Sequence, residues 1–526
     1  MLFDTSLSPK TFNQRFLEIF FPLTFILIGL YAAFHHSLWR DEMQGWMVAW
    51  KSDSWIELWR NNAPSGHPIL WSALVYLVKN ITGSPLSMQL LHWFLGSCAI
   101  ICFWRWNPFP IWQKALFTFG YFPFWEYYFV CRFYVLAELL TFIFCSLYPL
   151  RRVSYLPSAI CIGLLANTHA FSWSLSFAFF VMLVLDWYTN PQQRSIYLRN
   201  SNWFWDITLS ASLIILLCGF AAFSLLQVRD AVEVIPSNLD LRHLFRVIGR
   251  VFGGYVLIIP NHNRWFDLLF CGLITFGFVS ATITFLSRSK AALCLFISGV
   301  SFLFCFNFFI FLGVGSRHYG YYFLILIASL WIALHPSENL NNFKINFNFF
   351  SFYSKKLYFF FPYLFVFCLS VHLAAGLHRS FYDFYVPYSA GKATANYIKE
   401  KGWSDETIFG TRDVEVATVS GYLDRDIYYP ELNSFGSYAQ WKKRVPVETN
   451  DTLSLIESFS SSNPLIKRFL VVLSRDSAFR DLDIGDEIIQ GQLRIVTDRK
   501  FERSWIYPER FYLYWAERNV VKEFDK

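Results

Sequence analysis

The sequence predicts an all-α polytopic membrane domain followed by a soluble α/β domain. Of its 526 residues, 55% are hydrophobic and only 16% are charged, whereas soluble domains carry about 25% charged residues. Apolar runs of about 17–25 residues, which are long enough to cross a bilayer, recur as far as residue 376. More than half of the charged residues follow that point. We therefore expect a membrane domain over residues 1–376 and a soluble domain over residues 377–526.

The distribution of basic residues predicts how the chain crosses the membrane. Lys10 and Arg15 precede the apolar run 16–34 without a small-residue cleavage site after it, so we expect a retained anchor that starts in the cytoplasm. Later basic residues fall in cytoplasmic loops, where Lys and Arg are enriched, only if the apolar stretch 67–83 lies along the outer surface instead of crossing. This topology predicts about eleven transmembrane helices, one of them near 111–125. It also predicts interfacial helices in the first outer loop and a C-terminal domain outside.

The soluble domain is expected to mix helices and strands. A helix is predicted at 390–401, and short strands are predicted at 407–410 and 469–473. The serine-rich stretch 458–462 is expected to form a loop, because clustered serines are typical of connecting segments.

Charge and cysteine content exclude several functions. The formal net charge of +7 is spread over short loops, so membrane topology explains it and no nucleic-acid partner is expected. All ten cysteines precede residue 370, and nearly all lie inside apolar runs. Their spacing matches neither a disulfide framework nor a zinc site. We therefore expect neither a disulfide-stapled fold nor a cysteine-bound metal.

Polar residues of an unusual kind collect on the predicted outer side, often at the border of an apolar run, where a charge is costly. Each has an ordinary explanation alone: Asp41 could cap the short helix after it, His169 could close a helix, and Arg132 could reach into the head-group layer. Their occurrence on one face is what indicates a site. The candidates are Asp41, Glu42, His67, Arg132, Tyr134, His169, Arg317 and His318.

This combination of side chains suits group transfer from a phosphorylated lipid. Arginine donates two parallel hydrogen bonds to a phosphate and stabilises it as a leaving group. A carboxylate within reach of an acceptor hydroxyl or amine acts as a general base. The bilayer itself would carry the lipid tail of the donor. The residues alone therefore predict a membrane transferase with an outward-facing site.

The order of three motifs resembles the GT-C superfamily of integral membrane glycosyltransferases. The motifs are WRDEMQGWMVAW at 39–50, SGHPILW at 65–71, and an arginine near 132 in a later outer loop, with a soluble outer domain after the last span. The nearest branch contains the protein O-mannosyltransferases and the bacterial aminoarabinose transferase of lipid A. The resemblance is best over the first 190 residues. One departure is Ile69, which stands where a second proline is common.

The resemblance implies a GT-C-like fold and an inverting hexosyl- or pentosyltransferase that uses a polyprenyl-phosphate sugar, undecaprenyl or dolichyl. The acceptor would be a lipid, a polysaccharide or a protein, and the other partners would be membrane lipids. Asp41 would be the general base and Glu42 its neighbour in acceptor or donor contacts. The donor phosphate and sugar would be bound by His67, Arg132, Tyr134, His169, Arg317 and His318. No metal ligand is assigned, although some relatives hold a divalent ion, Mg²⁺ or Mn²⁺, with acids in this loop.

The expected location is a bacterial inner membrane, with the N-terminus cytoplasmic and the site and the C-terminal domain periplasmic. Three other functions stay open. A transporter or lipid flippase would place its polar residues near the midplane of repeated halves, and the sequence shows no repeat. A polymerase or ligase of lipid-diphosphate-linked glycans would also need arginines and a carboxylate. A non-catalytic carbohydrate-binding subunit would act through residues such as Trp403, Trp441, Tyr428 and Tyr429.

Overall fold

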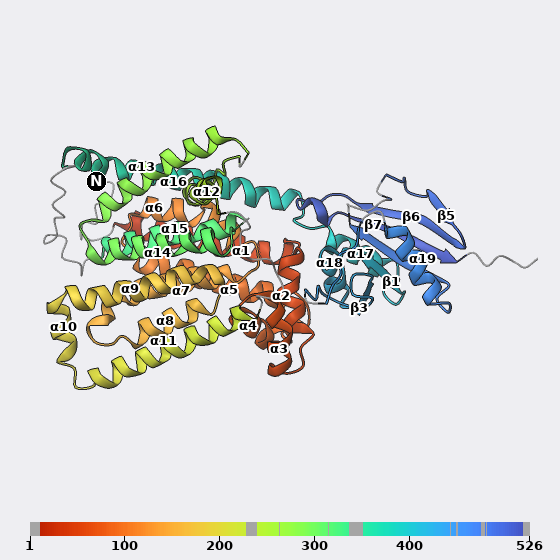
Figure 1. Ribbon diagram of the computed structural model, residues 1–526, viewed down its shortest axis with the longest axis horizontal. Coiled ribbons are helices and arrows are strands. Elements are labelled where there is room, and N and C mark those ends of the chain that lie inside the picture. The colour runs from red at the N-terminus through yellow and green to blue at the C-terminus, as the bar shows by residue number, and fades with distance from the viewer. Residues whose placement is uncertain are drawn as a thin grey trace, which may run out of the picture. The chain divides into compact units, whose positions relative to one another are not determined.

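The chain forms two compact units in the computed structural model (Figure 1). The helical unit comprises residues 1–31, 66–71 and 92–380, and the sheet unit comprises residues 32–65, 72–91 and 381–526. The division near 380 lies close to the predicted boundary at 376, but most of the first outer loop groups with the C-terminal segment. The structure describes residues 11–227, 239–261, 263–313, 315–335, 351–441, 443–448, 451–474, 479 and 481–518.

The helical unit is built from α-helices joined by short connections. Its longer helices are α1 (Phe12–His35), α5 (Leu86–Trp106), α7 (Tyr134–Leu147), α9 (Trp173–Thr189), α11 (Trp203–Leu226), α12 (Leu241–Val256), α13 (Trp265–Leu286), α14 (Lys290–Phe309), α15 (Ser316–Ala333) and α16 (Ser351–Tyr385). Its shorter elements are α6 (Ile111–Thr118), the π-helix η2 (Tyr121–Glu126), η3 (Tyr148–Arg152), α8 (Leu156–Ala166), η4 (Ala170–Ser172) and α10 (Pro191–Leu198). The ends of α1, α5 and α16 belong to the sheet unit.

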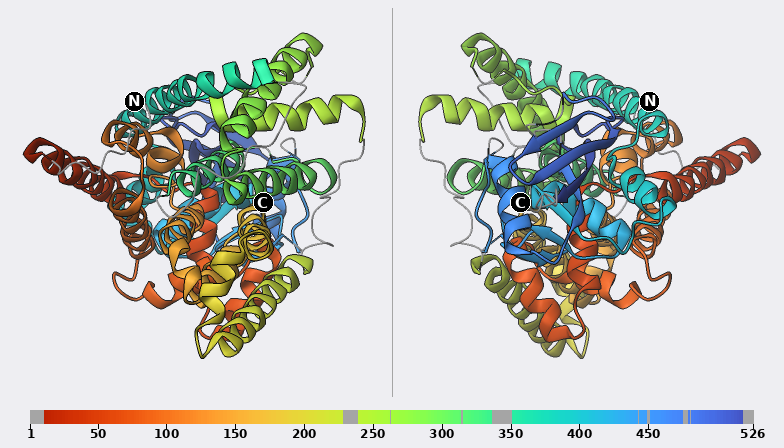
Figure 2. Two further views of the ribbon diagram at one scale, coloured as in Figure 1. Left: turned by 90° about the vertical axis from the view of Figure 1, so that its left-hand side faces the viewer. Right: turned by 90° about the vertical axis from the view of Figure 1, so that its right-hand side faces the viewer.

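Helix α15 is the buried centre of the helical unit. Every residue from Tyr319 to Ala333 is buried, as expected of a helix that is apolar on all sides. It packs against α7, α12 and α14 (Figure 1). Gly254 of α12 permits a close approach, because a Cβ there would lie 2.6 Å from the carbonyl oxygen of Tyr319. By contrast, α1 lies at the edge of the unit (dark red in Figure 2), with many of its apolar side chains exposed as lipid-facing side chains are.

The length and apolarity of the helices make this an integral, multi-pass membrane protein. Eight helical segments of the described chain are long and apolar enough to cross a bilayer, compared with about eleven expected. The difference has local causes. The span expected near 111–125 is divided between α6 and η2, and the eleven residues of α8 are only about 16 Å long. Helix α15 is long enough, but its first turns carry the polar sequence SRHYGYY.

The loop after α1, predicted to be the first outer loop, contains three short helices, α2 (Arg40–Trp50), α3 (Trp55–Asn62) and α4 (Leu70–Val78), with the 3-10 turn η1 (Ala63–Ser65) between the last two. Helix α4 has nine residues, which span about 14 Å of the roughly 30 Å of a bilayer core. This length agrees with the prediction that the stretch 67–83 does not cross the membrane.

The C-terminal segment forms a seven-stranded mixed sheet in the order β3-β2-β1-β4-β7-β6-β5. Strand β1 pairs in parallel with β2 and β4, and all other pairs are antiparallel. The strands are β1 (Ile408–Thr411), β2 (Ile427–Tyr429), β3 (Ser434–Gly436), β4 (Arg468–Ser474), β5 (Glu487–Gln490), β6 (Leu493–Phe501) and β7 (Phe511–Arg518). The helices are α17 (Gly391–Glu400), α18 (Asp413–Leu423) and α19 (Thr452–Ser462), and the 3-10 turn η6 (Tyr507–Glu509) precedes β7.

Both faces of this sheet are covered, because alternate residues of a strand point to opposite sides. Leu470 and Val472 of β4 join one apolar cluster with α17 and α18. Phe469 and Val471 join a second cluster that includes Phe459 of α19. The outcome is the soluble α/β domain that the sequence predicts.

The local predictions for this domain are mostly confirmed. The helix predicted at 390–401 is α17, and the strands predicted at 407–410 and 469–473 are β1 and β4. The loop predicted at 458–462 is wrong, because these residues form the last turns of α19. Ile456 and Phe459 anchor that helix in the core. The hydroxyl of Ser461 donates to the Glu457 carbonyl one turn earlier, so the serine is accommodated without breaking the helix.

Candidate functional site

The helical unit brings together the six residues predicted to bind the donor. They come from the turn before α4, the turn at the start of α7, the turn before η4, and the first turn of α15. These four places are far apart in the sequence, and only the fold joins them. The residues are His67, Arg132, Tyr134, His169, Arg317 and His318.

Three imidazole rings form the centre of this cluster. The ring centroid of His169 lies 5.1 Å from that of His67 and 5.8 Å from that of His318. The planes of His169 and His318 are only 7° apart. Phe133 lies 4.6 Å from both His67 and His169, and Tyr134 lies 5.3 Å from His169. Packing against aromatic rings therefore fixes the orientation of the imidazoles.

Two guanidinium groups add positive charge to the same place. The Arg132 guanidinium lies over the rings of Phe133 at 4.7 Å and Tyr134 at 5.7 Å. Burial holds the pKa of His169 well below its usual value, and the neighbouring His67, His318, Arg132 and Arg317 lower that pKa further. His169 is therefore neutral at neutral pH. Its Nδ1 accepts a hydrogen bond from the backbone N–H of Phe171, so the ring proton is on Nε2, which can donate to an anion.

A carboxylate with no predicted role holds one side of the cluster. Oε2 of Glu126, at the end of the π-helix η2, accepts from the Tyr121 hydroxyl at 2.7 Å and from the Ser316 hydroxyl at 3.0 Å. The hydroxyl of Tyr127 donates to the Arg317 carbonyl at 2.8 Å. These bonds connect η2 to the first turn of α15, which carries Arg317 and His318. An acid inside the aromatic run YFPFWEYYF is the sequence signal for such a role.

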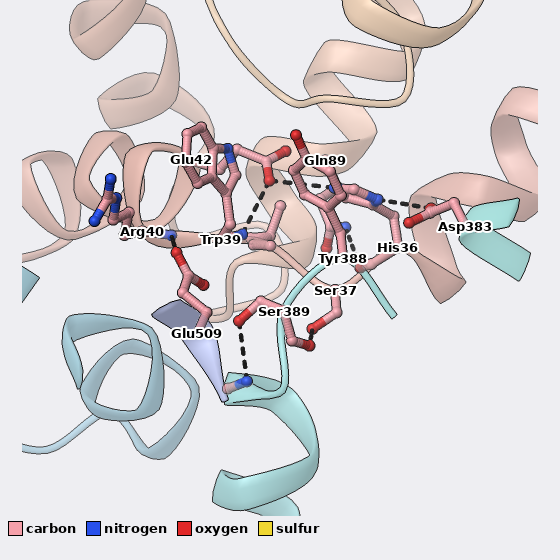
Figure 3. A network of polar contacts seen from close by, with 12 residues as sticks. His36, Ser37, Trp39, Arg40, Glu42, Gln89, Asp383, Tyr388, Ser389 and Glu509 are labelled. Atoms are coloured by element: carbon pink, nitrogen blue, oxygen red, sulfur yellow. Dashed lines mark hydrogen bonds and ion pairs between the residues drawn. The ribbon is translucent and has the colours of Figure 1, made fainter. Parts of the chain in front are cut away.

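The two predicted catalytic acids lie at the start of α2, in the sheet unit, and their environments differ. Figure 3 shows the surroundings of Glu42. The side chain of Asp41 is 28% exposed, and its Oδ1 lies 3.9 Å from Nε of Arg40. The side chain of Glu42 is enclosed. Its Oε2 accepts from the backbone N–H of Trp39 at 3.0 Å and lies 3.2 Å from Nε2 of His36. The side chain of Asp41 is thus partly exposed, whereas that of Glu42 is enclosed.

His36 links Glu42 to a second carboxylate. Its Nδ1 lies 2.8 Å from Oδ2 of Asp383, on the opposite side of the ring from Glu42. Burial alone would lower the pKa of His36, but the charges of Asp383 and Glu42 and their hydrogen bonds outweigh it and raise that pKa to about 10. His36 is therefore a buried imidazolium between two acids. Nothing in the local sequence around His36 indicates this pairing.

The described residues contain no ready-made cluster of side-chain ligands for a divalent metal, since no group of three or more His, Cys, Asp or Glu side chains among them is arranged to hold an ion. The acid pair of the first loop also does not fit, since Oε2 of Glu42 already binds His36 and the Trp39 amide. The buried histidines of the helical unit lie among arginines, whose charges oppose a cation.

Comparison with known proteins shows the fold. No protein-family profile and no curated protein matches the chain. Two solved structures are similar to it, both of ArnT from Cupriavidus metallidurans. The one bound to undecaprenyl phosphate is 12% identical, with a TM-score of 0.50 over 96% of this chain and 98% of that one. The apo structure is 11% identical, with a TM-score of 0.52 over 94% of this chain and 97% of that one. This similarity confirms the predicted GT-C-like fold.

Proposed function

We propose that this protein is a glycosyltransferase that transfers a sugar from a polyprenyl-phosphate carrier to an acceptor on the outer face of a bacterial inner membrane. The observation that carries the proposal is the gathering of two arginines and three histidines in one place of the helical unit. So many donors around a buried region suit an anion with several acceptor oxygens, and a phosphate is such an anion. The fold shared with a protein solved in complex with undecaprenyl phosphate supports a polyprenyl phosphate as that anion.

In the proposed reaction, an acceptor hydroxyl or amine attacks the anomeric carbon of the sugar. The new bond forms on the face opposite the leaving group, so the configuration inverts. The carboxylate of Asp41 takes the acceptor proton as general base. The bond between the anomeric carbon and the phosphate oxygen breaks, and its electron pair leaves on the polyprenyl phosphate. Arg132, Arg317 and the Nε2–H of His169 stabilise the charge on that phosphate.

The alternative functions predict different products. A polymerase or ligase that uses lipid-diphosphate glycans would release undecaprenyl diphosphate, and a flippase would release no free carrier. The carbohydrate-binding alternative loses support from the sheet unit: Tyr429 is fully buried, and Trp403 packs against Trp515 with ring centroids 5.0 Å apart. These two rings contribute to the core, whereas Trp441 is exposed.

The test measures undecaprenyl phosphate, the carrier that the proposed reaction releases whichever sugar the donor bears. The purified full-length protein is incubated with a bacterial lipid extract and its acceptor membranes, and undecaprenyl phosphate is measured by mass spectrometry. We expect its release by the wild type and not by Asp41→Asn. Release of undecaprenyl diphosphate instead, or equal release by Asp41→Asn, would contradict the proposal.

The proposed donor site is tested by binding. Undecaprenyl phosphate is titrated into the full-length protein in nanodiscs, and its affinity is compared for the wild type, Arg132→Gln and Arg317→Gln. We expect each variant to bind at least about 10-fold more weakly, since each removes charge-assisted hydrogen bonds of about 1.5–3 kcal/mol. Arg468→Gln is the matched control, because Arg468 is exposed and lies in the sheet unit. Unchanged affinity in both variants would place the phosphate elsewhere.

The proposed orientation is tested separately. An epitope tag at the C-terminus of the full chain is expected to be cleaved by protease added to intact spheroplasts. A tag that becomes accessible only after the membrane is permeabilised would reverse the orientation.

A further inference from the structure

The sheet of the C-terminal segment has a topological switch point between β1 and β4. The chain leaves β1 through α18 to β2 on one side, and it returns through α19 to β4 on the other side of β1. In open α/β sheets, ligands bind outside the carboxyl ends of the strands at such a point. Here that edge includes Thr411, which ends β1, and Ser474, which ends β4 and pairs with Phe511 at the start of β7.

At this edge the protein binds its own chain. The backbone N–H of Arg40 donates to Oε1 of Glu509 at 2.9 Å. Glu509 lies two residues before Phe511, the first residue of β7. The Arg40 guanidinium lies 2.5 Å from Oε1 of Glu415, which is in the first turn of α18 after β1. Both carboxylates are buried. Arg40 therefore occupies the place at which a sheet of this topology would bind a ligand.

The residues before Arg40 are also held by the part of the chain that follows residue 380 (Figure 3). We call residues 36–41 the acid-bearing segment. The Leu38 N–H donates to the Tyr422 hydroxyl at 2.8 Å, the Ser37 hydroxyl donates to the Ser389 carbonyl at 2.7 Å, and His36 pairs with Asp383. Four residues of a six-residue segment thus bind partners that lie more than 340 positions later in the chain.

The packing of α2 continues this attachment. A Cβ on Gly421 of α18 would lie 2.2 Å from Sδ of Met43, so the glycine permits the two helices to touch. Further along α2, Nε2 of Gln44 donates to the Ala439 carbonyl at 3.2 Å, and Nε1 of Trp50 donates to Oδ1 of Asp424 at 2.6 Å. The segment and the helix after it are therefore fixed along their length.

We infer that the C-terminal α/β domain is a positioning device for Asp41, and that Arg40, Glu415 and Glu509 are its positioning residues. Its contacts at the switch-point edge of the sheet hold the acid-bearing segment, so the carboxylate of Asp41 is oriented by the C-terminal domain. This inference rests on the proposed role of Asp41. Its physical basis is that displacement of a catalytic group by about 1 Å costs on the order of 100-fold in rate.

The test separates positioning from folding and from donor binding. The variants Arg40→Gln, Arg40→Lys, Glu415→Gln and Arg40→Gln/Glu415→Gln are assayed in the full-length protein for kcat, for KM and for undecaprenyl phosphate affinity. We expect Arg40→Gln to lower kcat by at least about 10-fold without changing the affinity, and Arg40→Lys to restore most of the loss. The double variant should lose no more kcat than the worse single variant, because both substitutions remove the same Arg40–Glu415 ion pair. Arg468→Gln, which breaks the Arg468–Glu406 pair of the same domain, is the control expected to keep wild-type kcat.

Two outcomes overturn the inference. One is that Arg40→Gln and Glu415→Gln both keep wild-type kcat while Asp41→Asn is inactive. This outcome would refute the positioning role but leave the proposed function intact. The other is a loss in the double variant equal to the product of the single losses, with no recovery in Arg40→Lys. If Arg40→Gln lowers the yield of folded protein, Glu415→Gln decides, because the Arg40 N–H keeps its bond to Glu509 in that variant. An active Asp41→Asn would instead contradict the proposed function itself.

Discussion

Nε2 of His36 lies 3.2 Å from Oε2 of Glu42, and this contact gives the two adjacent acids of the loop after α1 different surroundings. Glu42 turns inward to the imidazolium of His36, which also binds Asp383 at 2.8 Å. Asp41 keeps an accessible carboxylate. Breaking a buried pair from one side costs about 3–5 kcal/mol, because the remaining charge stays buried without its partner. Glu42 therefore contributes to the stability of the loop that carries Asp41.

The raised pKa of His36 predicts a loss of stability at alkaline pH. Its folded pKa of about 10 lies above the usual 6.5, so its contribution is fully present below pH 6.5 and is lost as the pH rises through about 10. We expect the half-life of the detergent-solubilised protein at elevated temperature to fall between pH 8 and 10. In Glu42→Gln, which removes one of the two charges that raise the pKa, the fall should begin at lower pH. Identical pH profiles of the two proteins would contradict this coupling.

Substitution of Asp41 should abolish transfer and leave the protein folded. Asp41→Asn keeps the shape of the side chain but removes the base, and general base catalysis contributes on the order of 100- to 10,000-fold. The measurements are kcat, yield after size-exclusion chromatography, and undecaprenyl phosphate affinity, of which only kcat should change. Asp53→Asn is the matched control, because Asp53 is an exposed acid of the same loop. A comparable loss of kcat in Asp53→Asn would point to the general charge of the loop instead of a base at Asp41.

The contact between α12 and α15 predicts a stability difference between two glycines. A Cβ at position 254 would lie 2.6 Å from a backbone oxygen of Tyr319, whereas a Cβ at position 219 in α11 has no atom within 4 Å. Gly254→Ala should therefore lower stability by about 1–3 kcal/mol, as overpacking does. Gly219→Ala should be neutral or stabilising by up to about 1 kcal/mol, because alanine favours helix. Thermal unfolding in detergent compares the two, and equal shifts would contradict the close approach of these helices.

The sequence predicts those parts of the molecule that depend on local composition. Long apolar runs suffice to indicate membrane helices, and the asymmetry of basic loops suffices to place six candidate donor-binding residues on one side. The structure then brings His67, Arg132 and His169 within contact of shared aromatic rings. The roles of these residues stay predictions, since only the arrangement has been observed.

Features that depend on long-range pairing were not predictable. His36 directly follows the first apolar helix and resembles any interfacial histidine, because its partner Asp383 lies 347 positions away. Arg40 is likewise far in sequence from its partners, 375 positions from Glu415 and 469 from Glu509, so its pairing with them cannot be predicted from local sequence. Serine composition predicts a loop at the end of α19, but the core contacts of Ile456 and Phe459 outweigh the local preference of serine and keep this end helical.

Glu126 offers a test of whether the π-helix shapes the proposed donor site. Its Oε2 accepts from the hydroxyls of Tyr121 and Ser316, and the latter residue directly precedes Arg317. In Glu126→Ala the hydroxyls of the buried Tyr121 and the half-buried Ser316 lose this acceptor and keep only each other, 2.8 Å apart, at about 1–3 kcal/mol for a hydroxyl left unsatisfied. We expect undecaprenyl phosphate affinity to fall as the first turn of α15 loosens. Glu126→Gln, which keeps one carbonyl acceptor, should recover part of both stability and affinity. Because Ser316→Ala removes only one of the two bonds, it should have the smaller effect. Wild-type affinity in Glu126→Ala would show that Arg317 and His318 are held in place without this network.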